Sequence, residues 1–235
     1  MTERGRDALV RSADTLAIGP SMLRWDGDTL VFDIDEITAP LPSRLRGQVR
    51  VHPLALVAES FALDPRERHQ WRPIAPRARV EVVLERPGLR WSGDGYLDSN
   101  HGIEPLEDGF VNWDWSRAHL RDHTAIVYDG ARRDGSNFAL ALKIAADGTV
   151  SAADAPPPAW LPMTRWRMAR ATRADAGAVT TVRKTWEDSP FYARAALDTQ
   201  LYGERVVAVH ESLSLDRFAS PVVRAMLPFR MPRRF

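Results

Sequence analysis

The chain has 235 residues, of which 44% are hydrophobic and 27% charged, a composition that excludes a disordered chain and provides apolar side chains for a core. Because 32 Lys and Arg balance 31 Asp and Glu, the net charge of +1 gives no general attraction to nucleic acid, and no nucleic-acid partner is expected. Cysteine is absent, which excludes disulfides, thiolate metal sites and thiol nucleophiles.

The N-terminal region is polar and charged. Residues 1–10 lack the apolar run of a secretory signal, and no apolar stretch approaches the roughly 18 residues of a membrane span. A short helix is predicted over residues 2–11. We therefore expect a cytoplasmic protein, for which peripheral contact with the inner membrane stays open.

Antiparallel strands are predicted wherever polarity alternates between turn residues. The segments 23–25 and 29–34 flank an Asp-Gly turn, which predicts a hairpin. Two more Asp-Gly turns, at 134–135 and 147–148, predict a meander of strands over 124–153. A helix is predicted from Ser220 and Pro221, a cap residue followed by proline in the first turn. Further strands are predicted at 47–52, 80–85, 124–128, 137–145 and 179–185.

Several familiar catalytic motifs are absent. The sequence has no glycine-rich phosphate loop, no His-Glu-x-x-His and no Gly-x-Ser-x-Gly, so no cofactor is expected and serine-hydrolase chemistry loses support. Of the histidines, His101, His119 and His123 lie near Asp122 in sequence, but nothing fixes a third ligand. No metal is expected, and the three histidines are interpreted as solvated turn residues.

Aromatic residues are concentrated between positions 71 and 115. In the segment 111–115, alternation along a strand places Trp113 and Trp115 on one face. One interpretation is that these rings fill the core of a barrel. The other is that they form a wall for an extended apolar ligand, since aromatic faces bind hydrocarbon and stabilise cations.

Two short pairs join an aromatic ring to a proton carrier. His69 and Trp71 share a face of a strand, and so do Tyr96 and Asp98. The ordinary alternative for the first pair is a loop histidine beside a packed tryptophan. For the second pair it is a strand end that leads into the turn at 100–102.

Long segments of the chain resemble one known family. They are MTERG at 1–5, LPSRLRG at 41–47, WRPIAP at 71–76, GYLDSN at 95–100 and WDWSR at 113–117. Through them almost the whole chain is similar to the carotenoid 1,2-hydratases, also called hydroxyneurosporene synthases, of photosynthetic and related bacteria. The family carries a further segment rich in Tyr and Trp ahead of the point that matches Met1.

The resemblance implies an all-β fold of two lipocalin-like antiparallel β-barrels, the first of them incomplete here. Residues 1–86 are then the remaining part of the first barrel, and 87–235 are the second barrel with a short C-terminal helix. The resemblance also implies cofactor-independent hydration of the terminal C1–C2 double bond of acyclic carotenoids such as neurosporene and lycopene, which gives 1-hydroxy carotenoids. The family's His-x-Trp and Tyr-x-Asp elements fall on His69, Trp71, Tyr96 and Asp98, the predicted catalytic residues.

A mechanism is expected in which Asp98, held protonated by burial, protonates C2. Trp71 and Tyr96 would stabilise the tertiary cation at C1, and His69 would orient water and accept its proton. The acid and base roles can be reversed. Trp113 and Trp115 are the predicted substrate-binding residues.

Two other functions stay open for this fold. One is a non-catalytic lipocalin-like carrier of a carotenoid or other lipid, and the other is a cyclase in which carbon captures the cation. The C-terminal segment from Ser220 mixes apolar residues with arginines and is interpreted either as a membrane-surface element or as a frayed tail. The sequence does not specify an oligomeric state.

Overall fold

The computed structural model describes residues 4–38 and 41–230, with side chains up to residue 227. The chain forms two compact units, and neither is one continuous stretch of sequence. Unit 1 comprises Met1–Leu56, Ala75–Leu97 and Arg224–Phe235, and unit 2 comprises Val57–Ile74 and Asp98–Val223. Strands β7 (His69–Arg86) and β8 (Leu89–Gly102) therefore each contribute residues to both units.

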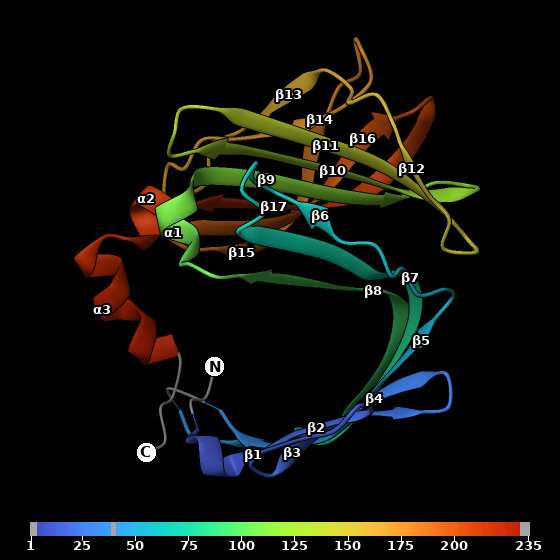
Figure 1. The fold of residues 1–235 in the computed structure, drawn as a ribbon, viewed down its shortest axis with the longest axis vertical. Helices are drawn as coiled ribbons and strands as arrows, with labels where there is room; N and C mark the ends of the chain where they lie inside the picture. The colour runs from blue at the N-terminus through green and yellow to red at the C-terminus, as the bar shows by residue number, and fades with distance from the viewer. Residues whose placement is uncertain (1–3, 39–40, 231–235) are drawn as a thin grey trace. The chain divides into compact units, whose positions relative to one another are not determined.

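Unit 1 is built from antiparallel strands that follow one another along the sheet (Figure 1). Gly27 adopts a φ of 59° between β3 and β4, a conformation that glycine reaches without steric cost, and the hairpin predicted there is confirmed. Leu30, Val51 and Ala78 form the buried centre of the unit. The strands are β1 (Leu9–Arg11), β2 (Thr15–Ile18), β3 (Ser21–Asp26), β4 (Thr29–Ile37) and β5 (Arg44–Pro53), followed by this unit's parts of β7 and β8.

The helix predicted over residues 2–11 is wrong for its described part. Arg6–Ala8 form one short 3₁₀ turn, and Leu9–Arg11 then form β1. The reason is tertiary, because β1 pairs with β2 in the register that joins Leu9 to Ile18. Residues 2 and 3 lie outside the described part of the chain.

Unit 2 contains a seven-stranded antiparallel sheet in the order β12-β11-β10-β9-β17-β16-β15. A separate hairpin, β13 (Pro158–Leu161) with β14 (Arg170–Arg173), lies on this unit, where β14 packs on β9 and β17 (Figure 1). The short strand β6 (Phe61–Ala62) pairs with the first residues of β7. The strands of the sheet are β9 (Phe110–His119), β10 (His123–Arg132), β11 (Asn137–Ala145), β12 (Val150–Ala152), β15 (Thr181–Asp188), β16 (Tyr192–Leu201) and β17 (Glu204–Ser214).

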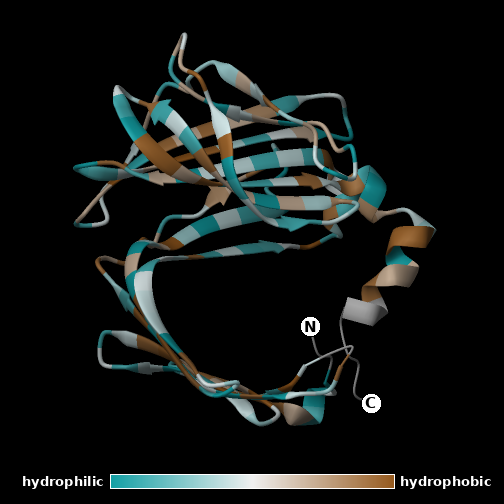
Figure 2. Cartoon of the chain, turned by 180° about the vertical axis from the view of Figure 1, so that it is seen from behind, coloured by the Kyte–Doolittle hydropathy of each residue, from teal (hydrophilic) through white to brown (hydrophobic). Residues whose placement is uncertain are grey.

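Side chains alternate between the two faces of the seven-stranded sheet, and Figure 2 shows that its strands carry both hydrophilic and hydrophobic residues. The register pairs Tyr128 with Trp115, Trp115 with Glu211, and Glu211 with Arg194, so these four residues share one face. On the other face, the register pairs Ser116 with His210. The first of these two faces is called the aromatic face below.

The mostly β, antiparallel fold class is confirmed. All the predicted strands are present, although the one predicted from 179 begins at Thr181, and the meander is β10-β11-β12. Among the described residues no pairing closes either large sheet on itself, so the two barrels stay a prediction. The domain boundary expected after residue 86 is likewise a proposal, and Pro87 and Gly88 form the turn between β7 and β8.

All three histidines interpreted as solvated turn residues lie in strands. His119 is the last residue of β9 and His123 the first of β10, and both are partly buried, so that interpretation is wrong for them. Their positions follow from pairing of the strand ends, in which His119 lies opposite Thr124. His101 is exposed, as expected, but it lies within β8 and not in a turn, so for this residue only the predicted exposure is confirmed.

Three α-helices are described: α1 (Leu106–Gly109), α2 (Leu215–Phe218) and α3 (Pro221–Arg230). The helix predicted from Ser220 and Pro221 is confirmed by α3. In the part of the chain that the structure describes, no helix combines the length and the apolar character that a membrane span requires.

Candidate functional site

Trp71 and Asp98 form a direct hydrogen bond within unit 2. Trp71 Nε1–H donates to Asp98 Oδ2 over 2.8 Å, although 27 residues separate the two in sequence. The indole of Trp71 is completely buried, because β6 pairs with β7 at this point and places Phe61 beside it, with ring centroids 5.8 Å apart. The structure therefore joins one member of each predicted pair.

Tyr128 of β10 lies at the centre of the ring cluster around Trp71. Its ring centroid is 5.6 Å from that of Trp71, 5.5 Å from that of Trp113 and 5.5 Å from that of Phe138, all in edge-on arrangements. Such contacts contribute roughly 0.5 to 1.5 kcal/mol each beyond area burial. Trp71 thus packs on the aromatic face of the seven-stranded sheet.

Burial is the main cause that raises the pKa of Tyr128 far above its ordinary value, and the charge of Asp98 raises it further. The phenol therefore stays protonated at all physiological pH values. Asp98 acts electrostatically on Tyr128 and on Glu211, which places its carboxyl group close to the aromatic face. The site thus combines a carboxyl group, a neutral hydroxyl group and several ring edges.

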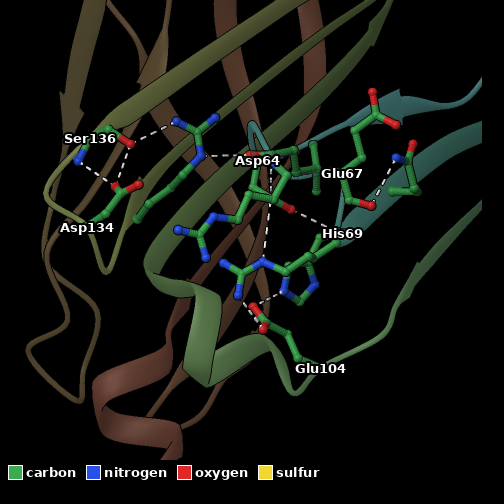
Figure 3. A network of polar contacts seen from close by, with 11 residues as sticks. Asp64, Glu67, His69, Glu104, Asp134 and Ser136 are labelled. Atoms are coloured by element: carbon green, nitrogen blue, oxygen red, sulfur yellow. Dashed lines mark hydrogen bonds and ion pairs between the residues drawn. The ribbon is translucent and has the colours of Figure 1, made fainter.

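His69 is buried in a separate polar network, which Figure 3 shows. Its Nε2 lies 3.2 Å from Glu104 Oε1, and its backbone N–H donates to Asp64 Oδ2 over 2.8 Å (Figure 3). Arg68 donates to the other oxygen of Glu104 over 2.6 Å. Burial by itself raises the pKa of Asp64, but the backbone N–H groups of His69 and its neighbours outweigh this and lower it.

The imidazole of His69 is enclosed by backbone as well. A Cβ atom at Gly102 would lie 2.7 Å from its Nδ1, and one at Gly109 would lie 2.7 Å from its Nε2. The ring also meets Phe110 edge-on, with centroids 4.9 Å apart. Its described contacts are thus with Glu104, the two glycines and Phe110.

The remaining predicted residues lie on two elements. Tyr96 is a half-buried residue of β8 in unit 1, two positions before Asp98. Trp115 is buried beside Tyr128 in the strand register, as a core residue would be. Trp113 is partly exposed, but its Nε1 is buried and makes no hydrogen bond within the described residues.

Sequence reasoning missed three residues of this region, namely Tyr128, Glu104 and Glu211. Alternation correctly predicted the strand that carries Tyr128, but it does not identify which strands are neighbours. Glu104 lies in the turn segment before α1, where no local pattern marks it. Only the pairing of β17 with β9 brings Glu211 beside Trp115.

The opposite face of the sheet carries a chain of polar side chains that sequence reasoning also missed. The Nδ1 of His210 lies 2.7 Å from Ser116 Oγ, and its Nε2 lies 2.9 Å from Ser212 Oγ. Ser212 Oγ donates to the carboxyl group of Asp114, and Ser116 Oγ lies 2.8 Å from Thr172 Oγ1 of β14. The chain therefore links β9 and β17 to the hairpin that covers them.

Burial shifts the two titratable groups of this chain in opposite directions. It raises the pKa of Asp114 to about 7, although the hydrogen bond from Ser212 opposes the shift. It lowers the pKa of His210 to about 3, and the charge of Arg170 adds to this effect. Both groups are therefore predominantly neutral in the folded state at mildly acidic pH.

This arrangement predicts compensating pH dependences of stability. Between the ordinary pKa values of 3.8 for Asp114 and 6.5 for His210, the folded pair holds one proton, and so does the unfolded pair. In Asp114→Asn only the histidine remains, so the unfolded state binds more protons and the free energy of unfolding should rise with pH. In His210→Gln only the carboxyl group remains, so the folded state binds more protons and the free energy of unfolding should fall as the pH rises. Each slope should reach about 1.4 kcal/mol per pH unit.

The measurement is denaturant unfolding of the wild type and both variants at several pH values from about 4 to 6.5. Slopes are compared as differences from the wild type, because other groups titrate in the same range. If the three proteins show the same pH dependence, the two groups do not have the shifted pKa values described above.

The comparisons with known sequences converge on one family. The whole chain, residues 1–235, matches the family model described as carotenoid hydratase CrtC. The chain is 58% identical over 99% of its length to an acyclic carotenoid 1,2-hydratase of Thiocapsa roseopersicina, and 47% identical over all of it to one of Rubrivivax gelatinosus. It spans 58% of the length of each of these two relatives. A relative of Rhodobacter capsulatus with the same name is 45% identical, and the chain covers 84% of it.

Solved structures support the fold alone, since their identities are low. A crystal structure assigned to AttH from Nitrosomonas europaea has a TM-score of 0.59 at 14% identity, covering 88% of this chain and 72% of the other. A crystal structure of CghA with Sch210972 has a TM-score of 0.56 at 12% identity, covering 88% and 69%. These neighbours agree with the lipocalin-like, antiparallel β fold class.

Proposed function

Because this chain belongs to the carotenoid hydratase family, we propose that it adds water across the terminal C1–C2 double bond of an acyclic carotenoid to give a 1-hydroxy carotenoid. The observation that carries the proposal is the hydrogen bond between buried Trp71 and Asp98, formed against the aromatic face. A carboxyl group among aromatic rings suits an alkene, which requires an acid for protonation and an apolar surface for binding.

In the proposed reaction, the carboxyl group of Asp98 gives its proton to C2. The π electrons form the new C2–H bond, and C1 becomes a tertiary cation. Ring faces stabilise such a cation by roughly 1 to 2 kcal/mol each when the site is desolvated, and each contribution of about 1.4 kcal/mol is a tenfold gain in rate. Trp71 and Trp113 of unit 2 are the proposed rings, and the role of Tyr96 stays a prediction from the family resemblance. Water then adds at C1, and loss of its proton gives the tertiary alcohol.

His69 is proposed as a positioning residue. The sequence suggested that it accepts the proton of water, but its Nε2 faces Glu104, and the backbone at Gly102 and Gly109 encloses the ring. His69 shares a face of β7 with Trp71, so the contacts that fix His69 also fix the strand that carries the indole. Its substitution should then act through the position of Trp71.

The proposed substrate is a long polyene that resides in a bilayer, so we also propose peripheral contact with the inner membrane from the cytoplasmic side. Helix α3 exposes Val222 and Met226 and carries Arg224, which is also exposed. Apolar and basic residues together favour the surface of an anionic membrane.

The function is tested by incubating the protein with lycopene or neurosporene in detergent or vesicles, followed by mass spectrometry of the pigment. We expect a product whose mass has increased by one water and which carries a tertiary hydroxyl group. Pigment that is bound but unchanged in mass would indicate a carrier, and an isomer of equal mass would indicate a cyclase. Either outcome contradicts the proposal.

A further inference from the structure

A second carboxylate, that of Glu211, lies on the aromatic face. Strand register places Glu211 directly beside Trp115, whose other cross-strand neighbour is Tyr128. Directly opposed residues of paired strands have Cβ atoms about 5 Å apart, so Glu211 lies two strands from the phenol that contacts Trp71. Glu211 and the Trp71–Asp98 pair therefore border the same ring surface.

The electrostatics of the carboxyl groups agree with this placement. Burial is the main cause that raises the pKa of Glu211, and the negative charge of Asp98 raises it as well. Two like charges in the same region of a protein raise each other's pKa in this way. Ionisation of one carboxyl group therefore disfavours ionisation of the other, which suits one proton donor and one proton acceptor.

The contacts of Glu211 favour its role as the acceptor. Arg194 Nε lies 3.2 Å from Glu211 Oε1, so the guanidinium stabilises the ionised carboxylate. The hydroxyl group of Tyr192 also hydrogen-bonds to Glu211. Asp98, in contrast, receives a hydrogen bond from the neutral indole of Trp71. A neutral donor stabilises an ionised carboxylate less than a guanidinium does, so this contact favours ionisation of Asp98 less than Arg194 favours that of Glu211.

A donor for water lies on the same face. Trp113 contacts Tyr128, and its buried Nε1–H makes no hydrogen bond within the described residues. Buried donors are almost always paired, so such a group marks a place where a polar ligand can bind. A water molecule held by this N–H would lie on the ring surface that Glu211 borders.

We propose that Glu211 is the general base of the site and takes the proton of the water that attacks C1, whereas Asp98 supplies the proton that adds to C2. This inference rests on the proposed hydratase function. The oxygen lone pair of water forms the C1–O bond, and the resulting oxonium loses one proton to Glu211. Return of that proton from Glu211 to Asp98 restores the starting state, so the net change is the addition of one water.

The test is Glu211→Gln, which keeps the size of the side chain and removes the base. General-base catalysis contributes about 10² to 10⁴ in rate, so kcat should fall at least about a hundredfold while KM changes little. The acidic limb of the pH profile of kcat, which reports protonation of the base, should disappear. The groups that contact Glu211 or act on it electrostatically, and so affect this limb, include Asp98, Arg194, Tyr192, Tyr128 and Glu187.

Glu204→Gln is the matched control, because Glu204 begins the same strand and accepts a hydrogen bond from the backbone N–H of Arg121 at a distance from the ring cluster. It should retain wild-type kcat. Glu211→Asp, which withdraws the carboxylate by one methylene, should be slow but should keep the acidic limb, an outcome that a merely structural role does not predict. Unfolding transitions of all variants show whether each is folded.

Wild-type kcat and an intact acidic limb in Glu211→Gln would overturn the role of Glu211 and leave the hydratase proposal standing. Absence of hydrated product with the wild type would overturn the hydratase proposal itself. If Glu211→Gln does not fold, Glu211→Asp decides the question, since wild-type kcat in that variant contradicts a positioned base.

Discussion

Replacement of Asp98 by Asn is expected to reduce hydration by about 10² to 10⁴-fold while the protein still folds and still binds pigment. Asparagine has the same shape, and its carbonyl oxygen can still accept the hydrogen bond that Trp71 Nε1 donates to Asp98 over 2.8 Å. What it cannot do is give a proton to an alkene carbon. The measurement is the initial rate of formation of the hydrated carotenoid, with pigment binding followed by absorbance.

The control for this prediction is Asp94→Asn. Asp94 lies four residues earlier in β8 and is exposed, so its substitution should leave both the rate and binding unchanged. If Asp98→Asn hydrates the carotenoid at the wild-type rate, the proton comes from another group. A variant that loses binding together with rate would instead show that Asp98 shapes the pocket.

Replacement of Trp71 is expected to have the largest effect on stability. Its side chain is fully buried and touches the rings of Phe61 and Tyr128, so Trp71→Ala should lower the free energy of unfolding by about 3 to 5 kcal/mol. Trp71→Phe keeps one ring but removes the N–H that holds Asp98. That variant should lose less stability than Trp71→Ala. It should still hydrate the substrate at least about tenfold more slowly, since losing a transition-state contribution of about 1.4 kcal/mol lowers the rate tenfold.

Chemical denaturation measures the first effect and the rate of hydration measures the second. Trp91→Phe serves as the control, because Trp91 is 48% exposed in β8 and should tolerate the change in both assays. A Trp71→Phe protein with full activity would indicate that the indole N–H is not needed to position Asp98. A Trp71→Ala protein of wild-type stability would contradict the packing described for this ring.

The sequence predicted the strands of the meander well because alternation and Asp-Gly turns act over a few residues. It failed at the N-terminus, where Leu9–Arg11 form a strand by pairing with β2 instead of continuing a helix. It also misplaced His119 and His123, whose positions depend on the pairing of β9 with β10. The preference of a segment for a strand depends on its context, so pairing with a neighbouring strand decides the conformation there.

For the candidate site, the alternation of residues on β7 and β8 suggested the pairs His69 with Trp71 and Tyr96 with Asp98. The sequence does not show which residues of the two pairs contact each other, because this depends on the tertiary structure. There, Trp71 hydrogen-bonds to Asp98, whereas His69 lies beside Glu104. Likewise, the sequence placed Trp113 and Trp115 on one face, but only strand order could add Tyr128 and Glu211 to it.

The sequence by itself determined the β class, the positions of most strands and turns, and the residue types available for acid and base chemistry, because these depend on side chains a few positions apart. The tertiary structure decided which carboxyl groups are neighbours and which histidine is enclosed. It also revealed the buried chain from Asp114 to Thr172. The physical reason is that burial and charge proximity arise only when strands distant in sequence pair, and these two effects set protonation and hydrogen bonding.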